Sequence, residues 1–393
     1  MKVAYVVPRY GLEVVGGAEF AARMLAERLA ARPGWDVEVL STAAVDTTTW
    51  ADEYPTGTVE LNGVTVRRFS SASGRDAGFE RLSRRILADP GRATRAEAER
   101  WIDLQGPRNP DLVAAVATSD ADVVAFYPYL YHPTVHGLPV VGRRGVLHPA
   151  AHDEPPLRLP LFGPVFGAAA GLVFQTRGER RLVERLFPVA ATRQLEMGLG
   201  VEEGGGEPEA ARATVAGLGD RPYLLYVGRV DDGKGTSVLS WFFATYKRRH
   251  PGPLALVVAG PVVDPPPPAP DVLVVGPVDE SVKWGLLRGA EAFVHPSAYE
   301  AFSLVLVEAW SAGRPVIVNA RCVATREHCE RSGGGLWFDG YASFEAVVGR
   351  MLADREMREA LARRGAAYVA ATFRWPALIE RYASFLEAVA ARA

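Results

Sequence analysis

Two segments of this sequence repeat one order of elements, and that repetition constrains the fold more than any other feature. In the first, an apolar run at residues 3–7 leads through a polar, glycine-bearing loop into helical periodicity over residues 18–31. In the second, the run Tyr223–Val227 leads into a glycine-bearing loop at residues 228–235 and a further helix. This order opens a doubly wound parallel sheet, in which ligands bind beyond the carboxyl ends of the strands. The sequence therefore predicts two α/β domains.

Length and composition agree with a two-domain globular protein. A chain of 393 residues exceeds the size of one ordinary core, and 48% hydrophobic with 23% charged residues is typical of globular chains. The net charge of -2 gives no cationic field for nucleic acid, so no nucleic-acid partner is expected. Cys322 and Cys329 are the only cysteines, and with His328 between them they match no zinc module. Two cysteines form no disulfide framework, so a cytoplasmic location is expected.

Further short apolar runs extend both sheets. A hairpin is expected over residues 58–69 around Asn62-Gly63, and residues 157–174 are expected to form a buried helix and strand rather than a membrane span. Other strands are expected at residues 35–40, 122–127, 144–147, 172–175, 254–259, 272–275, 292–294 and 315–318. A Gly/Glu-rich stretch around residues 198–209 predicts the boundary, with domains at 1–199 and 200–372 and a final helix at 373–393.

The segment 74–109 is rich in arginine. It contains one or two predicted helices and Arg81, Arg84, Arg85, Arg92, Arg95 and Arg100. A solvated helical face explains these charges, and a surface for anionic lipid or an anionic acceptor is the alternative.

The loop after Tyr223–Val227 has the chemistry of a phosphate site. Gly228 lets backbone amides approach an anion, the next helix contributes its N-terminus, and Arg229 and Lys234 supply positive charge. The spacing nearly matches a nucleotide-triphosphatase P-loop. Gly235, however, stands where that loop needs Ser or Thr for magnesium.

Two glutamates flank the start of a later helix. Glu300 is expected in the loop, within reach of a sugar hydroxyl, and Glu308 two turns into the helix facing the same cleft. Backbone amides near Phe302 and Ser303 suit a diphosphate. Because Glu308 lies in an apolar run, it is expected to be partly buried and to need a hydroxyl or amide partner.

Two polar clusters in the first half are weaker candidates. Residues 147–154 follow a strand and contain His148, His152, Asp153 and Glu154, so one of them is expected to touch substrate. Asp120 and Asp122 resemble a metal-binding Asp-x-Asp, but they precede a strand and lack further ligands. No metal site is predicted.

These motifs resemble those of one family, the retaining GT-B glycosyltransferases of the family 4 type. The resemblance covers nearly the whole chain, and it is most specific in the 228–235 loop and the E-x7-E pair Glu300 and Glu308. Residues 16–19 look like the family's N-terminal glycine loop, and residues 373–375 like its last crossover segment. The resemblance implies two Rossmann-like domains facing each other across a cleft. The first would bind the acceptor, the second the donor, and the last helix would cross back to the first.

The family also implies roles for single residues. Arg229 and Lys234 would bind the donor diphosphate, Glu308 the ribose and Glu300 the transferred sugar. The remaining contacts would come from Gly16, Gly17, His152, Gly228, Gly276, Val278, Phe302, Ser303 and Leu304, with Gly276 and Val278 beside the base and His152, or else His148, against the sugar. The family commonly has Gly-Phe-Gly where this chain has Ala301-Phe302-Ser303, so the sugar contacts of that backbone are in doubt.

The implied activity is transfer of a sugar from a UDP- or GDP-linked donor to an acceptor hydroxyl, with retention and without metal or cofactor. The acceptor can be a sugar, a lipid or a natural product, and the arginine-rich helices would permit peripheral contact with a membrane. Within the fold, an epimerase or a phosphorylase is the lesser alternative, the latter requiring a pyridoxal lysine. A non-catalytic nucleotide-sugar-binding subunit is the alternative from another class.

Overall fold

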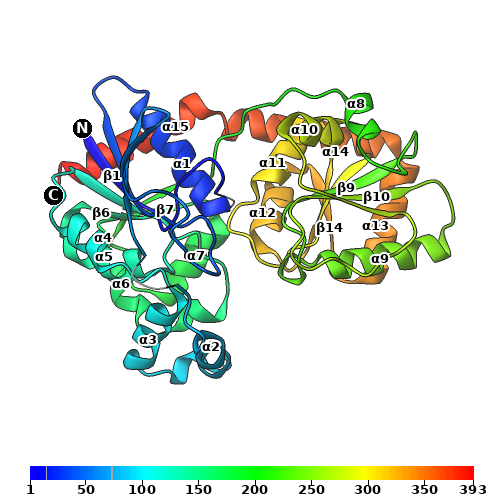
Figure 1. Cartoon of the computed structure of the whole chain (residues 1–393). Coiled ribbons are helices and arrows are strands. Elements are labelled where there is room, and N and C mark those ends of the chain that lie inside the picture. Colours follow the sequence, from blue (N-terminus) through cyan, green and yellow to red (C-terminus); the bar gives the residue numbers. More distant parts are fainter. Residues whose placement is uncertain (15, 72–73) are drawn as a thin grey trace. The chain divides into compact units, whose positions relative to one another are not determined.

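The computed structural model describes residues 1–14, 16–71 and 74–393. Within them the chain divides into two compact units, Met1–Gly198 with Pro376–Ala393, and Leu199–Trp375. The boundary expected from the sequence was between residues 199 and 200. Each unit is a mostly parallel sheet with helices on its faces (Figure 1). This is the α/β architecture that the two strand-loop-helix segments predicted.

The first unit contains an eight-stranded sheet in the order β3-β4-β2-β1-β5-β6-β7-β8 among the described residues. All neighbouring strands are parallel except β3 and β4, which form the predicted hairpin. Asn62 and Gly63 both have positive φ, at 50° and 78°, as a two-residue hairpin turn requires. The strands are β1 (Lys2–Val6), β2 (Asp36–Thr42), β3 (Gly57–Leu61), β4 (Val64–Phe69), β5 (Val123–Phe126), β6 (Gly145–Leu147), β7 (Gly171–Phe174) and β8 (Arg193–Glu196).

Helices cover both faces of this sheet, and short 3-10 turns join some of them. The α-helices are α1 (Gly17–Ala30), α2 (Phe79–Leu87), α3 (Arg95–Gln105), α4 (Pro110–Ala117), α5 (His132–Val141), α6 (Phe162–Ala168), α7 (Arg177–Leu186) and α15 (Trp375–Ala390). The 3-10 turns are η1 (Pro90–Arg92), η2 (Gly142–Arg144) and η3 (Pro155–Arg158). From Pro376 onward, α15 belongs to this unit, where Phe385 packs on Gly171 of β7.

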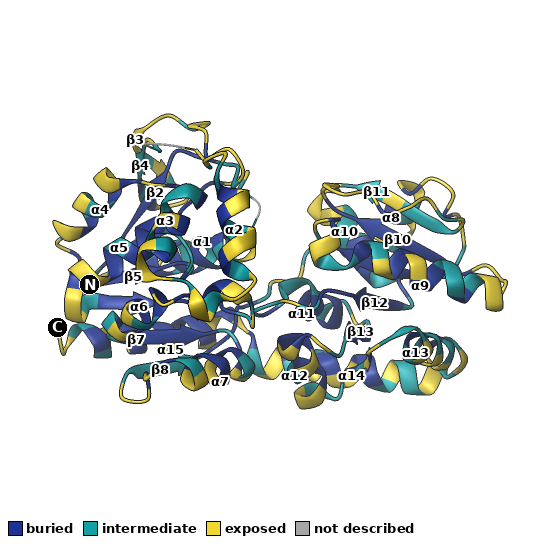
Figure 2. Ribbon diagram, turned by 90° about the horizontal axis from the view of Figure 1, so that it is seen from below, coloured by how far each residue is buried: buried dark blue, intermediate teal, exposed yellow. Residues whose placement is uncertain are grey.

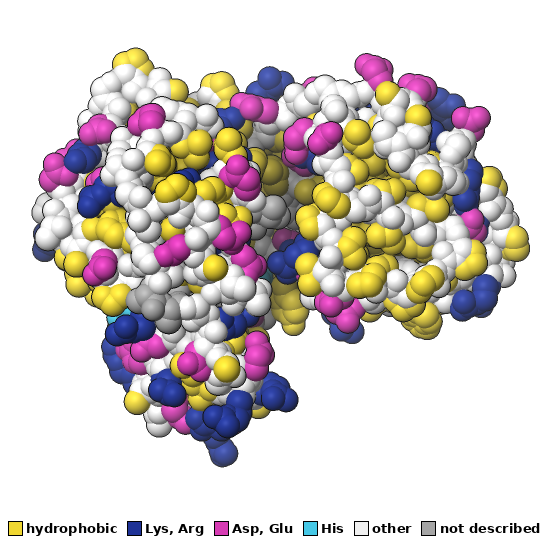
Figure 3. Space-filling model, in the orientation of Figure 1, with side chains coloured by type: hydrophobic (Ala, Val, Ile, Leu, Met, Phe, Trp, Pro, Cys, Tyr) yellow, Lys and Arg dark blue, Asp and Glu magenta, His cyan; other side chains and the backbone are white. Residues whose placement is uncertain are grey.

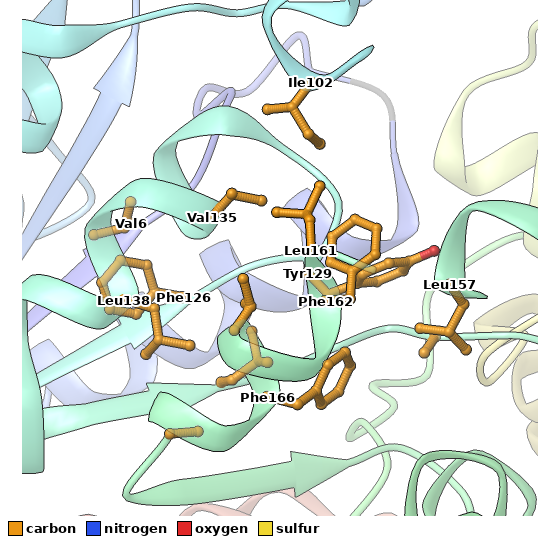
Figure 4. Packing of buried hydrophobic residues seen from close by; sticks show 14 of the residues in the cluster. Val6, Ile102, Phe126, Tyr129, Val135, Leu138, Leu157, Leu161, Phe162 and Phe166 are labelled. Atoms are coloured by element: carbon orange, nitrogen blue, oxygen red, sulfur yellow. The ribbon is translucent and has the colours of Figure 1, made fainter. Parts of the chain in front are cut away.

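A large hydrophobic cluster of the first unit lies between the sheet and the helices α2 to α7. Tyr129, Phe162 and Phe166 gather there at the centre of the cluster (Figure 4), with ring centroids 4.8 Å apart for Tyr129 and Phe162. Together with β7, α6 forms the buried helix and strand expected within residues 157–174. No helix among the described residues is long and apolar enough to cross a membrane.

The second unit contains a six-stranded, fully parallel sheet in the order β11-β10-β9-β12-β13-β14. The strands are β9 (Tyr223–Val227), β10 (Ala255–Ala259), β11 (Val272–Gly276), β12 (Ala292–His295), β13 (Val316–Asn319) and β14 (Gly335–Phe338). Around them lie α8 (Pro208–Ala213), η4 (Asp232–Lys234), α9 (Thr236–Arg249), α10 (Glu280–Gly289), α11 (Leu304–Ser311), α12 (Val323–Ser332), α13 (Tyr341–Ala353) and α14 (Arg355–Thr372). The central strands are buried, and exposed residues face outward on the helices (Figure 2).

The ten strands expected from the sequence, besides the hairpin pair, are all present within one or two residues of their predicted ends. Two strands were missed, β8 and β14, and these lie at the edges of the two sheets. Within the second unit, the order of strands places β10 and β12 on opposite sides of β9. This reversal of direction marks the position at which parallel α/β sheets bind ligands.

Candidate active site

The switch point of the second sheet carries two of the predicted motifs. The loop after β9 contains Arg229 and Lys234, and the loop after β12 contains Glu300. Because β9 and β12 are paired parallel neighbours, their carboxyl ends lie at the same edge of the sheet. Parallel pairing thus explains why residues from two separate motifs meet.

Asp231 organises the loop after β9. Its Oδ1 accepts the Lys234 backbone N–H at 2.7 Å, and its other oxygen forms an ion pair with Arg229. Gly228 has φ 151°, and a side chain there would approach the Tyr226 hydroxyl. The loop is therefore held by its own acid, and Arg229 is paired before any ligand arrives.

Gly235 explains why this loop is no P-loop. Its φ is 75°, and a Cβ at this position would lie 3.0 Å from the carbonyl oxygen of Pro296. The Ser or Thr that a P-loop requires at this position would be strained and crowded. The backbone conformation of the loop thus requires glycine at position 235, where a P-loop has Ser or Thr.

Lys234 and Glu300 form the centre of the site. The Lys234 ammonium lies 2.6 Å from Oε1 of Glu300, and His295 Nε2 donates to the same oxygen at 3.2 Å. Burial raises the pKa of Glu300, but the hydrogen bond from His295 and the charge of Lys234 outweigh it and lower the pKa to about 2. Glu300 is therefore fully ionised at neutral pH. His295, the last residue of β12, was not predicted as a site residue.

Glu308 has a partner that the sequence did not reveal. It is the fifth residue of α11, so it lies one turn into the helix and not two, because the helix begins only at Leu304. The expected hydroxyl or amide partner is instead the ammonium of Lys283 on α10, 2.9 Å from Oε1. Burial raises the pKa of Glu308, and the charge of Lys283 opposes that rise.

The segment before α11 has Ser303 where the family commonly has glycine. Ser303 precedes Leu304 at the N-cap of α11 with φ 69° and ψ 79°, a left-handed conformation that disfavours residues with a side chain. Phe302 is buried against His328 and Phe373, with ring centroids 5.1 and 5.2 Å away. The backbone therefore keeps a glycine-like conformation although the residue is serine.

Two further predicted donor residues lie beyond the end of β11. Gly276 has φ 71°, and its carbonyl oxygen accepts the N–H of Gly260 at 2.7 Å. Val278 is half-buried and directly precedes the turn into α10. Their place at the same carboxyl edge of the sheet is the one that the base-binding prediction requires.

Gly16 and Gly17 belong to the first unit. The helix α1 begins at Gly17, and a side chain at Gly16 would collide with Glu19 and approach Arg9. Arg9 and Glu19 form a buried ion pair, Nε to Oε1 at 3.1 Å. Gly16 thus leaves room for this ion pair beside the start of the helix.

His148 was the alternative to His152 for the sugar contact, and the structure places it in the core of the first unit. It is 3% exposed, its ring stacks on Tyr127 with centroids 4.0 Å apart, and Tyr382 on α15 lies 2.9 Å from its Nε2. Burial lowers its pKa well below the ordinary range. His148 is a packed core residue because strand β6 directs it inward.

His152 is half-buried in the loop after β6, with Nδ1 3.2 Å from the carboxylate of Glu154. Asp153 pairs with Arg158 and Arg185. The fully buried Glu179, which the sequence did not single out, accepts the Ala151 N–H at 2.8 Å and fixes this loop. Its burial raises the pKa to about 7 against its backbone hydrogen bonds.

Asp120 and Asp122 hold the first strand. Asp122 accepts the backbone N–H of Lys2 at 2.8 Å, and Asp120 pairs with the Lys2 ammonium. Elsewhere among the described residues, Asp103, His132 and His136 have the spacing of a metal site. Arg108 lies 3.8 Å from Asp103, however, and the Asn109 N–H points at Nδ1 of His132.

The predicted arginine-rich face is exposed on α2 and α3, where basic side chains gather in the space-filling view (Figure 3). Several of these arginines are paired with acids of the same two helices and the turn between them: Arg85 with Glu97, Arg92 with Asp89 and Arg95 with Glu99. These pairs are those of a solvated helical surface.

Known proteins share this sequence pattern and architecture. A model of the family described as "Glycosyl transferases group 1" matches residues 209–368. D-inositol 3-phosphate glycosyltransferase of Acidothermus cellulolyticus is 28% identical over 93% of this chain and 84% of its own length.

Among solved structures, sucrose-phosphate synthase of Thermosynechococcus elongatus aligns over 100% of both chains with a TM-score of 0.73 and 19% identity. An Anabaena protein in complex with UDP and glucose aligns over 99% of this chain and 100% of its own, with a TM-score of 0.68 and 16% identity.

Residues 209–368, which make up most of the second unit, match the group 1 glycosyltransferases. The fold of the chain is GT-B, as the motifs predicted. The matched range contains Arg229, Lys234, Glu300 and Glu308, so the family assignment and the cluster at the switch point fall on the same unit.

Proposed function

We propose that this glycosyltransferase moves a sugar from a nucleoside-diphosphate sugar to an acceptor hydroxyl, with retention of configuration and without a metal ion. The contact between Lys234 and Glu300 carries this proposal. It places a cation and a carboxylate side by side at the switch point. A nucleotide sugar presents the complementary pair, because its diphosphate is anionic and its sugar hydroxyls donate hydrogen bonds.

The cations of the loop supply the main catalytic effect in this proposal. As the glycosidic C–O bond breaks, the diphosphate leaves with the electron pair and gains negative charge. Arg229 and Lys234 stabilise that charge once the ligand has replaced Asp231 and Glu300 as their partner. Two positioned cations perform the task that a divalent metal performs in other transferases.

Retention is proposed from the family resemblance, and a double displacement is not proposed because Glu300 suits a nucleophile poorly. Glu300 has its pKa lowered to about 2 and is held by Lys234 and His295, and Glu308 is held by Lys283. A carboxylate of such low basicity is a weak nucleophile. The acceptor oxygen then attacks from the face that the diphosphate leaves, and its proton passes to the departing phosphate.

The names of similar proteins guide the choice of substrates. The Anabaena structure was solved with UDP, which supports uracil as the first base to test. D-inositol 3-phosphate glycosyltransferase and sucrose-phosphate synthase support a polyol or sugar phosphate as the first acceptor class. We assign the acceptor to the first unit and the donor to the second, as the family resemblance implies.

Ser303 favours a second candidate function, a non-catalytic nucleotide-sugar-binding subunit. A serine in the left-handed conformation replaces the expected glycine beside the sugar site. Such a subunit would bind the nucleotide yet release no nucleoside diphosphate from the donor. Slow hydrolysis of the donor by the purified chain alone therefore decides between the two.

A thermal screen with UDP, GDP, ADP and TDP tests the donor site directly. A ligand at about 100 times its Kd adds roughly 2.7 kcal/mol to a folded state that alone binds it. We expect one nucleotide to raise the melting temperature of the wild type, and Glu308→Ala to abolish the shift. Glu345→Ala, which removes a carboxylate paired with Arg249 on the surface, is the control and keeps the shift. If no nucleotide stabilises the wild type, the proposed function is wrong.

A further inference from the structure

Lys283 is a buried lysine that the proposed chemistry has not yet used. It lies one turn into α10, and its side chain is only 13% exposed, although lysine is rarely buried unless it is paired. Its ammonium contacts Oε1 of Glu308 and Oε2 of Glu280, each at 2.9 Å. Glu308 is on α11, so this ion pair joins two helices.

The two acidic partners of Lys283 differ in burial. The side chain of Glu280 is 78% exposed, and that of Glu308 is 9% exposed. Solvent screens the first pair, so its contribution is small. The second pair compensates a carboxylate that has lost its water, and removing the lysine would leave that charge uncompensated.

The charge state of Glu308 depends on this pairing. Burial raises the pKa of Glu308, and the charge and hydrogen bond of Lys283 work against that rise. Without Lys283 the pKa of Glu308 would rise further, and the carboxyl group would take up a proton more readily. A carboxylate accepts hydrogen bonds at both oxygens, whereas a protonated group loses part of that capacity.

The second oxygen of Glu308 is the feature that points to a ligand. Oε2 is buried and accepts no hydrogen bond from any residue in the described ranges. A buried acceptor without a donor costs free energy, so such groups in native structures call for an explanation. A hydroxyl group of a bound ligand would supply the missing donor.

We propose that Lys283 is a positioning residue of the donor site: it holds Oε1 of Glu308 so that Oε2 receives a ribose hydroxyl of the nucleotide. This inference rests on the proposed function. The position of Lys283 in the fold supports this role, because α10 begins directly after Gly276 and Val278, which are predicted to border the base. Lys283 thereby links the base and ribose parts of the site and favours ribonucleotides over deoxyribonucleotides.

The test compares binding of UDP and 2′-deoxy-UDP, measured by calorimetry at pH 7.5, or the corresponding pair for whichever base the wild type binds. A hydrogen bond to a charged group corresponds to roughly tenfold or more in affinity, so the wild type is expected to prefer the ribonucleotide by about that factor. Lys283→Met is expected to lose most of this preference, and Lys283→Arg to retain it. Lys283→Gln repeats the test with a polar residue if the methionine variant does not fold.

Two controls separate positioning from general stability. Lys247→Met removes a lysine that is also buried and is paired with Asp271. Asp271 directly precedes β11, so this pair lies at the amino ends of the strands, away from the site, and the change is expected to leave the preference unchanged. Glu280→Gln removes the exposed partner and is also expected to leave it unchanged. In Lys283→Met, the remaining affinity for UDP should fall more steeply with decreasing pH than that of the wild type, because Glu308 without its lysine takes up a proton more readily.

The possible outcomes are distinct. If the wild type binds no nucleoside diphosphate, the proposed function fails. If the wild type discriminates and Lys283→Met and Lys283→Gln discriminate equally well at every pH, the role of Lys283 is wrong and the donor site stands. If Lys247→Met loses the preference as well, the effect is one of stability, and the positioning role is likewise overturned.

Discussion

The Lys234 ammonium lies 2.6 Å from the Glu300 carboxylate, although 66 positions of sequence separate the two residues. Adjacent parallel strands bring them together, since each residue lies in the loop that follows its strand. The pair is partly buried, with side chains 29% and 15% exposed. A diphosphate that binds Lys234 replaces Glu300 as its partner. A sugar hydroxyl that donates a hydrogen bond to Glu300 then compensates this carboxylate for the lost ion pair. The two ligand groups are therefore expected to bind together.

Lys234→Met is expected to lower kcat/KM for the donor by roughly 10²- to 10³-fold, the usual cost of removing a group that stabilises developing charge. The double variant with Glu300→Gln should cost less than the sum of the two single changes, because residues in contact are energetically coupled. Steady-state kinetics over a range of donor concentrations measures both effects. Lys247→Met is the control, because Lys247 pairs with Asp271 at the amino ends of the strands, away from the site. Wild-type rates for Lys234→Met would remove the diphosphate role.

Transfer is expected to survive EDTA. Arg229 and Lys234 provide the positive charge at the switch point, and the Asp-x-Asp carboxylates are engaged elsewhere, Asp120 and Asp122 both contacting Lys2. The measurement is the initial rate before and after chelation, followed by addition of magnesium or manganese. Complete loss of activity that either metal restores would contradict the metal-independent mechanism.

His328 is expected to make the protein sensitive to acid. Burial lowers its pKa from near 6.5 to about 3, so the unfolded chain takes up a proton that the folded chain does not. The contribution of neutral His328 is therefore complete above about pH 6.5 and decreases as the pH falls from there toward 3. His328→Phe should keep the ring contact with Phe302 and lose less stability between pH 7 and pH 5 than the wild type does. Denaturant unfolding at both values measures this, and equal losses would contradict it.

Parallel strands and glycine loops could be read from the sequence because each leaves a local signal. β9 is an uninterrupted apolar run, and Gly228, Arg229 and Lys234 follow it at once. β8 was missed because its residues, Arg-Gln-Leu-Glu, are polar and half-buried at a sheet edge. β14 is short and begins at a glycine after a helix, which hides its start.

The partners within the site could not be read in the same way. Lys283 lies in an ordinary helical sequence, and only the packing of α10 on α11 brings it to Glu308. Only the family resemblance favoured His152 over His148, which lies four positions earlier, and the structure buries His148 directly after β6 and leaves His152 in a loop. Side-chain direction and packing between elements decide such cases, and the order of residues does not encode them locally.

Substitution of Ser303 tests whether the left-handed backbone at the start of α11 is strained. The backbone of Ser303 has φ 69°, a conformation that costs a residue with a side chain about 1 to 3 kcal/mol, whereas glycine adopts it without strain. Ser303→Gly is therefore expected to raise the free energy of unfolding by about 1 kcal/mol, after the greater flexibility of glycine in the unfolded chain is subtracted. Ser303→Ala removes the hydroxyl and keeps the Cβ, so it should give no such gain. Denaturant titration of the three proteins compares them, and donor kinetics shows whether the glycine also raises kcat. A gain from alanine equal to that from glycine would mean that the hydroxyl, 3.5 Å from His295 Nε2, and not the backbone conformation, is the source of strain.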